Sequence, residues 1–171
     1  GRGDEDVVRS LRGRMVAGVI AASDSISDDM LEELVRLKRD SAASVVLADY
    51  QKQNDGDICG VFFDYERGAA LAAEYLLQKG HRRIAFATTH LDRRSRVYRY
   101  ESFGKTLRAN GVAFGEENTF LCSGETSFQS GVELSDILLE SAYQPTAVAA
   151  INDTVASGIL SGLASKGVKV P

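Results

Sequence analysis

The apolar residues of this chain come in short runs, and stretches of helical length separate them. Most of the runs are apolar throughout and do not alternate with polar residues, which is typical of strands covered on both faces of a sheet. Valine, isoleucine, alanine and phenylalanine dominate them. We therefore predict strands over residues 15–22, 44–49, 58–63, 83–88, 119–122 and 146–151.

The stretches between these runs have the spacing of amphipathic helices. In the first of them, Leu31 and Leu34 lie three residues apart, and Asp28 and Asp29 fall in the first turn, where the helix dipole favours acidic side chains. Three of the predicted helices end at a glycine, the residue that most readily follows a helix. The predicted helices cover 27–40, 65–80, 96–111, 127–142 and 153–167, and the three glycines are Gly80, Gly111 and Gly167.

Alternation of strand and helix predicts βαβ units and a mostly parallel sheet. Right-handed crossovers then place helices on both faces, which gives a doubly wound arrangement. Residues 5–13 have the pattern of the last turns of a helix with no strand before it, and residues 165–171 stop where another strand is expected. Because a sheet without its outer strands exposes apolar edges, we expect the chain to be an excerpt truncated at both ends.

Composition narrows the functional classes. The chain has 171 residues, 44% hydrophobic and 26% charged, as in a soluble globular protein, and its formal net charge is −4. Its one local basic cluster is the short segment 92–99, so this chain alone is not expected to bind DNA. Neither a membrane span nor a signal peptide is indicated. Cys59 and Cys122 are interpreted as buried thiols in a reduced compartment.

Short polar residues follow the predicted strands at the ends where ligands bind in open α/β sheets. They mix hydrogen-bond donors with acceptors, which suits a hydroxyl-rich or small polar ligand. Each of them alone is equally explained as a helix cap or a turn residue. They are Ser23 and Asp24, Asp49 and Tyr50, Asp64, Thr88 to His90, Ser123, Glu125 to Ser127, and the pair Asn152 and Asp153.

The basic segment contains one arginine that differs from the others. Arg93, Arg94 and Arg96 are expected to lie in solvent at a helix start. Arg99 instead shares the inward face with Phe103, four residues on, and an inward guanidinium is costly unless a carboxylate or ligand pairs with it. Its planar fork can grip carboxylates and vicinal hydroxyls with two parallel hydrogen bonds.

Catalytic signatures are missing from the sequence. It contains no GxSxG elbow, no P-loop and no GxGxxG after a strand. Its two histidines, His81 and His90, do not make a usual zinc set. We therefore expect neither enzymatic activity nor a metal or other cofactor.

Three segments resemble the lactose-repressor/galactose-repressor (LacI/GalR) family, in register over nearly the whole chain from about Val16. The first, "FDYERGAALAAEYLLQKGHRRIAFAT", is similar to the family's D-x-x-x-G…GH-R-R-I-A segment. The second, "RVYRYESFGKTLRANGV", resembles its R-x-x-G-F…L…G segment. The third, "PTAVAAINDTVASGILSGLASKGVKVP", resembles its P-T-A…N-D…A-x-G…V-P segment.

The resemblance implies an effector-binding core built like a periplasmic binding protein, with two α/β lobes around an effector cleft. Residues 1–63 would form the N-terminal lobe without its first strand, and residues 64–171 the C-terminal lobe without its last strands. A helix-turn-helix head that binds the DNA operator would precede Gly1. The protein would then be a cytoplasmic, homodimeric transcriptional repressor that senses a sugar-like metabolite.

The family's effector-binding positions fall on specific residues of this chain. The resemblance carries an effector-contacting role to Ala22, Ser23, Asp49, Ser95, Arg99, Thr126 and Asn152. It also implies that Asn152 faces the ligand while Asp153 helps to begin the helix. Two residues depart from the family pattern: Ser102 replaces a usual glycine, and Thr126 replaces a frequent aromatic platform for ring stacking, although Phe128 lies nearby.

Two other functions stay open on the sequence alone. A periplasmic sugar-binding protein of a transport system would have the same fold and no DNA-binding head. A small α/β enzyme acting on a polar metabolite would use Asp49 or Asp153 as its base.

Overall fold

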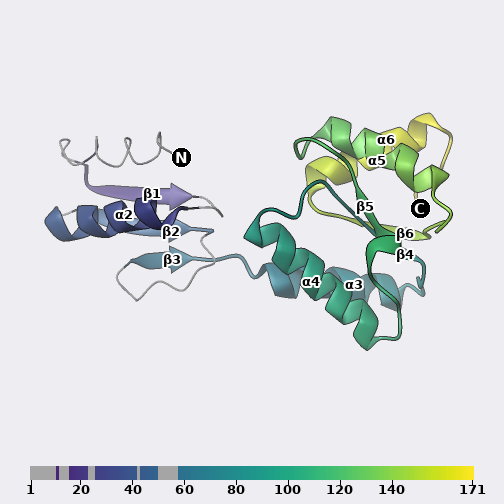
Figure 1. Cartoon of the computed structure of the whole chain (residues 1–171), viewed down its shortest axis with the longest axis horizontal. Coiled ribbons are helices and arrows are strands. Elements are labelled where there is room, and N and C mark those ends of the chain that lie inside the picture. Colours follow the sequence, from purple (N-terminus) through teal and green to yellow (C-terminus); the bar gives the residue numbers. More distant parts are fainter. Residues whose placement is uncertain (1–10, 12–15, 23–25, 42, 50–57) are drawn as a thin grey trace. The chain divides into compact units, whose positions relative to one another are not determined.

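The computed structural model describes residues 11, 16–22, 26–41, 43–49 and 58–171 (Figure 1). Contacts divide the chain into two compact units, Gly1–Phe63 and Asp64–Pro171. Their assignment as the two lobes of an effector-binding core stays a prediction. The predicted helix end at 5–13 lies, except for residue 11, outside the described residues.

The first unit is a small parallel sheet with a helix packed on it. Its strands, in the spatial order β1-β2-β3, are β1 (Gly18–Ala22), β2 (Ser44–Ala48) and β3 (Cys59–Val61). Helix α2 (Asp28–Asp40) begins after Ser27, whose side chain accepts a hydrogen bond from the Met30 N–H. Leu34 and Leu37 of this helix are buried in one cluster with Val45 and Leu47 of β2.

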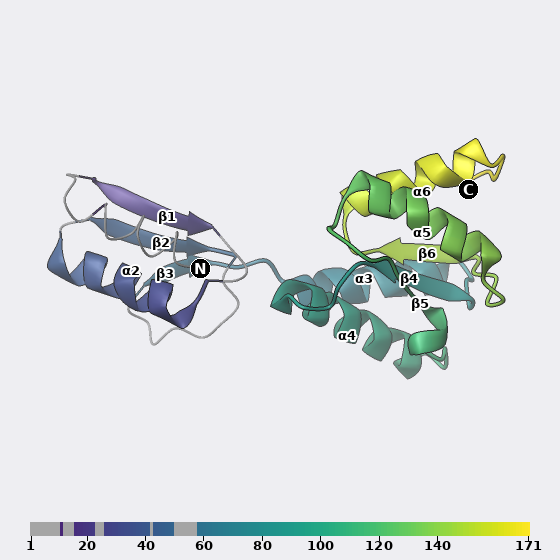
Figure 2. The same ribbon diagram turned by 45° about the horizontal axis from the view of Figure 1, so that its top comes forward.

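The second unit is a three-layer α/β sandwich. Its parallel sheet has the spatial order β5-β4-β6, with the fully buried β4 in the centre. Helices α3 and α4 cover one face, and α5 and α6 cover the other (Figures 1 and 2). This is the predicted doubly wound arrangement. The elements are α3 (Tyr65–Gln78), β4 (Ile84–Thr88), α4 (Arg94–Ala109), the 3₁₀ turn η1 (Glu116–Asn118), β5 (Thr119–Leu121), α5 (Phe128–Glu140), β6 (Ala147–Ala150) and α6 (Asp153–Ser165).

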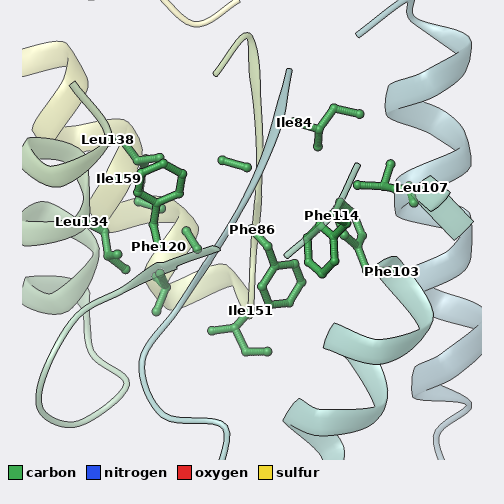
Figure 3. Packing of buried hydrophobic residues seen from close by; sticks show 14 of the residues in the cluster. Ile84, Phe86, Phe103, Leu107, Phe114, Phe120, Leu134, Leu138, Ile151 and Ile159 are labelled. Carbon is green, nitrogen blue, oxygen red and sulfur yellow. The ribbon is translucent and has the colours of Figure 1, made fainter. Parts of the chain in front are cut away.

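Aromatic rings fill the layer between the sheet and helices α3 and α4 (Figure 3). The Phe86 ring of β4 lies 5.2 Å from that of Phe103 on α4 and 6.2 Å from that of Phe114, centroid to centroid. Tilted and edge-on ring pairs add to the free energy of burial because the positive edge of one ring meets the negative face of another. This layer fixes α4 to the sheet.

Close backbone contact joins α5 and α6 on the opposite face. A Cβ atom added at Gly158 would lie 2.1 Å from the Phe128 carbonyl oxygen and 2.8 Å from the Gly131 Cα. Only glycine lets two helices approach this closely. Toward the sheet, Phe120 of β5 packs with Leu138 and Ile159 (Figure 3).

The structure confirms every predicted strand and every predicted helix that falls among the described residues, with ends shifted by a few residues. Gly80, Gly111 and Gly167 follow their helices with positive φ angles, as predicted. The prediction of two buried thiols is wrong for Cys59, which is exposed because β3 is an edge strand; Cys122 is buried. Among the helices of the described part, none is long and apolar enough to cross a membrane.

Candidate functional site

The carboxyl ends of β4, β5 and β6 meet at one edge of the second unit's sheet, because the three strands are parallel. Three loops lie beyond this edge: residues 89–93 after β4, 122–127 after β5, and 151–152 after β6. In open parallel sheets, ligands bind at this edge.

Arg96 joins two of these loops. Its Nη1 donates to the His90 carbonyl oxygen and to Asp92 Oδ1, both at 3.1 Å, and its Nη2 donates to Thr126 Oγ1 at 2.6 Å. A further hydrogen bond of 2.8 Å links Thr126 Oγ1 to Thr89 Oγ1. The Arg96 side chain is only 14% exposed. One guanidinium therefore fixes the loop after β5 against the loop after β4.

A cavity of about 580 Å³ opens beside Arg96. Residues with hydrogen-bonding or charged groups form most of its wall, which suits a small polar ligand. Another cavity, of about 680 Å³, has mostly apolar walls from α3, α5, β6, α6 and residues 168–171, and lies away from the carboxyl ends of β4 and β5. The polar cavity is therefore the candidate site, and it is lined by His90, Asp92, Arg93, Arg96, Gly124, Glu125 and Thr126.

Arg99, one turn further along α4, is half-buried. Its guanidinium lies 4.1 Å from the centre of the Tyr65 ring, and its Nη1 is 3.5 Å from the Ile151 carbonyl oxygen. Within the described part of the chain, no carboxylate forms an ion pair with it. The ring stabilises the cation without consuming its N–H donors, so those donors stay available to a ligand.

Ser102 fixes α4 to the start of α3. Its hydroxyl donates to the Glu66 carbonyl oxygen at 2.7 Å. The departure from glycine at this position therefore adds a helix–helix hydrogen bond next to the Tyr65–Arg99 contact. Together these two contacts fix the turn of α4 that carries Arg99.

Asn152 begins helix α6. Its Oδ1 accepts a hydrogen bond from the Val155 N–H at 3.0 Å, so Asn152 is the cap and Asp153 is the first helical residue. The Asn152 side chain is nonetheless exposed. Since the oxygen is occupied by capping, the amide Nδ2 group is the part of Asn152 that can donate to a ligand.

Cys122, directly after β5, is a buried thiol beside the Glu133 carboxylate, to which its Sγ donates at 2.8 Å. Burial raises the pKa of Cys122 to about 11, and the hydrogen bond to Glu133 and its negative charge act in the same direction. The thiol is therefore protonated at neutral pH. A protonated thiol is a poor nucleophile.

The sequence was compared with known families and proteins. Residues 3–171 match the family described as periplasmic binding proteins and sugar binding domain of LacI family. This chain belongs to that family. The predicted fold class, periplasmic-binding-protein-like α/β, and the predicted effector-binding domain of the LacI type are thereby confirmed.

Relatives of the LacI family are similar over nearly the whole chain. The HTH-type transcriptional repressor PurR of Vibrio atlanticus (strain LGP32) is 27% identical over 97% of this chain and 48% of its own length. Catabolite control protein A of Priestia megaterium is 27% identical over 96% of this chain and 48% of its own length. The chain therefore spans about half the length of these curated relatives.

A solved LacI-family structure has the same fold. It is a transcriptional regulator from Enterococcus faecium with bound ribose, 29% identical, with a TM-score of 0.79 over 98% of this chain and 60% of that chain. The relatives named here are transcriptional regulators.

The predicted effector positions fall in both units. Ser95, Arg99, Thr126 and Asn152 all lie at the described edge of the second unit's sheet. Arg99 reaches the carbonyl next to Asn152, and Thr126 contacts Arg96. In the first unit, Ala22 ends β1 and is exposed, Asp49 follows β2, and Ser23 lies outside the described residues.

Asp49 has an unusual backbone. Its φ is +65°, a left-handed conformation that non-glycine residues rarely adopt, although aspartate tolerates it better than most. Its N–H donates to the Val61 carbonyl oxygen at 2.8 Å, so the turn is held to β3. Such conformations are concentrated at ligand sites, which keeps Asp49 a candidate contact.

The sequence analysis was wrong about Arg96 and missed Tyr65. Arg96 was expected in solvent, but Arg99 follows it by three residues and Phe103 follows Arg99 by four, which places all three on the buried face of α4. That periodic signal was present in the sequence. The contact of Tyr65 with Arg99 joins residues of different helices, and no local pattern reveals it.

Proposed function

We propose that this chain is the effector-sensing part of a LacI-type transcriptional repressor, and that a small polar metabolite binds at the carboxyl edge of β4, β5 and β6. Arg99 would grip the ligand, Thr126 and Ser95 would line its site, and the Asn152 amide would donate to it. Ala22, Ser23 and Asp49 would supply contacts from the first unit's strand ends.

The observation that carries this proposal is the state of Arg99. Burying a guanidinium is costly unless a partner compensates for its lost hydration. Here a half-buried Arg99 has an aromatic ring and one long hydrogen bond to a carbonyl, and its fork still has free donors. An arginine that is fixed in position and still has unused N–H donors suits a ligand with paired oxygen atoms, such as vicinal hydroxyls or an oxyanion.

A sugar or sugar derivative is the ligand class that the chemistry supports best. The polar cavity is lined by charged and hydroxyl side chains and by the His90 imidazole, and none of its lining residues is Phe, Tyr or Trp. The relative from Enterococcus faecium, solved with bound ribose, shares this fold. Thr126 offers a hydroxyl where stacking of a flat ring would require an aromatic side chain.

In the whole protein, effector binding would shift the equilibrium between two conformations of the regulator and so change its affinity for the operator. The operator would be contacted by a helix-turn-helix head outside this chain, since the chain itself has a net charge of −4. We also propose that the protein is a homodimer, and that it acts in the cytoplasm, where its operator is.

The test begins by finding the effector with a thermal-shift screen of sugars, sugar phosphates, sugar acids and purines against the full-length protein. Isothermal titration calorimetry then compares Arg99→Ala with the matched variant Arg94→Ala, since Arg94 is exposed on the first turn of the same helix. We expect Arg99→Ala to weaken effector binding by about tenfold or more, because charge-assisted hydrogen bonds contribute about 1.5–3 kcal/mol. Unchanged affinity in a folded Arg99→Ala variant contradicts the proposal.

The transport alternative has less support, because the curated relatives compared here are named as transcriptional regulators. An operator-binding assay on the full-length protein separates the two. Specific DNA binding that the effector alters supports regulation, whereas effector binding without any DNA binding supports transport.

A further inference from the structure

We infer that Arg96 determines the specificity of this site, and that the effector carries an oxyanion, a phosphate or a carboxylate, on a polyhydroxylated carbon skeleton. This inference rests on the proposed function, because it concerns the ligand of the same site. It assigns Arg96 a role that the family pattern did not give it.

The first observation is the number of donors on Arg96. A guanidinium has five N–H groups. Three of them donate to the His90 carbonyl, Asp92 and Thr126. The Nε–H and one Nη2–H remain, and these two nitrogens form one edge of the planar fork. A phosphate or carboxylate matches such an edge with two parallel charge-assisted bonds.

The second observation is that Arg96 is held in place before any ligand arrives. Its three acceptors lie in two different loops, and its side chain is 14% exposed. A long arginine side chain normally loses rotamer freedom when it binds a ligand. Because Arg96 is already ordered by protein contacts, most of that cost falls on folding and not on effector binding.

The third observation is the local charge. The cavity wall carries two arginines, Arg93 and Arg96, and two carboxylates, those of Asp92 and Glu125. The Asp92 carboxylate that pairs with Arg96 is 64% exposed, so solvent screens that pair. Glu125 also lines the cavity and opposes an anion there. Arg99, which has no carboxylate partner among the described residues, adds a further positive charge nearby.

The fourth observation is the start of helix α4. Arg93 occupies the cap position, no side chain caps the helix, and the first turn contains no acidic residue. The N-terminal end of a helix is partially positive, and an anion placed there is stabilised. With Arg96 at the cavity wall, this helix start adds to the attraction for a negatively charged group.

The selection between ligands follows from these contacts. A neutral sugar can accept hydrogen bonds from Arg96 but gains nothing from the local positive charge. A flat aromatic ring meets Thr126, which is hydrogen-bonded to Arg96 and Thr89 and offers no face for stacking. A sugar phosphate or sugar acid uses both the fork and the charge.

The test uses calorimetry on the full-length protein with four probes: D-glucose, D-glucose 6-phosphate, D-gluconate and inorganic phosphate. We expect inorganic phosphate to bind, and at least one of the two anionic sugars to bind about tenfold or more tightly than glucose. The two anionic probes distinguish a phosphate from a carboxylate source. Absence of binding by all three anions overturns the inference.

Arg96→Gln is the decisive variant, and Arg94→Gln is its matched control, since Arg94 is exposed and does not line the cavity. We expect Arg96→Gln to weaken phosphate binding by about tenfold and Arg94→Gln to change it less than about twofold. Phosphate affinity that is equal in both variants contradicts the inference.

Arg96→Gln also removes the link between two loops, so its fold needs a separate check by thermal unfolding. If the variant is unfolded, NMR spectroscopy of the wild-type protein provides the test. The Arg96 Nε–H resonance shifts during a phosphate titration if the inference holds, and stays fixed if it fails. A third outcome separates the two proposals. If a neutral sugar binds, Arg99→Ala weakens that binding, and phosphate does not bind, then the proposed function stands and only the oxyanion is rejected.

Discussion

The two faces of the second unit's sheet are built on different principles. Between β4 and helices α3 and α4 the packing relies on large rings, with Phe103 99% buried against Phe86 and Phe114. Between α5 and α6 the contact relies on missing side chains, with Gly158 against Gly131. Rings fill space with adaptable contacts, whereas backbone contact between helices leaves no room for adjustment.

One α-helix start of the aromatic face differs from the other three α-helix starts of this unit. On the glycine face, Ser127 caps α5 and Asn152 caps α6 with a side-chain oxygen. On the aromatic face, Asp64 caps α3 in the same way, whereas α4 follows Arg93 without a side-chain cap. The polar cavity lies beside the one α-helix start of this unit that has no side-chain cap. The comparison indicates that the face whose rings fix α4 to the sheet also holds the candidate site.

The largest effect on stability is expected from removing one ring of the aromatic layer. Phe103→Ala should lower the free energy of unfolding by about 4 kcal/mol, because it removes a buried ring and leaves a cavity. Phe128→Ala is the matched control: its ring is 47% exposed, so the cost should stay below about 1 kcal/mol. Urea denaturation followed by circular dichroism measures both. Similar costs for the two variants would show that the ring layer does not carry this face.

The next effect tests the glycine face with one methyl group. Gly158→Ala should cost about 3 kcal/mol, since its Cβ would lie 2.1 Å from a backbone carbonyl oxygen and α5 would have to move away. The same change at Gly68 on α3 should stabilise the protein by about 0.5–1 kcal/mol, because an added Cβ there would meet nothing within 4 Å beyond the backbone of its own helix. Thermal and urea unfolding give both values, and two changes of the same sign would break the distinction between the faces.

The smallest effects concern the helix starts. Asn152→Ala should cost about 1 kcal/mol, because the Val155 N–H loses its acceptor. Arg94→Glu should instead stabilise the protein by about 0.5 kcal/mol in low salt, since an acidic side chain then faces the positive end of α4. Denaturation at low and high ionic strength tests the second value, which should shrink as salt screens it. Destabilisation by Arg94→Glu would mean that the start of α4 is already satisfied.

Much of the fold could be predicted from local patterns. The apolar run within 83–88 predicts a strand covered on both faces, and Gly80 and Gly111 predict helix ends, because these features depend on neighbours in sequence. The site was predicted less completely. Spacing alone placed Arg99 on the inward face of α4, and the same spacing argument, had it been extended, would have included Arg96.

The sequence by itself determined the strands, the helices, the doubly wound class and the polar residues at the strand ends, since hydrophobic period and capping chemistry act over a few residues. Only the tertiary structure decided which of those polar residues meet. Arg96 reaches Thr126, 30 residues further along the chain, because the parallel strand order brings the loop after β5 beside the start of α4. Arg99 lies on the Tyr65 ring because α3 and α4 pack side by side. Such contacts depend on the packing of whole layers, and packing is a property of the folded chain.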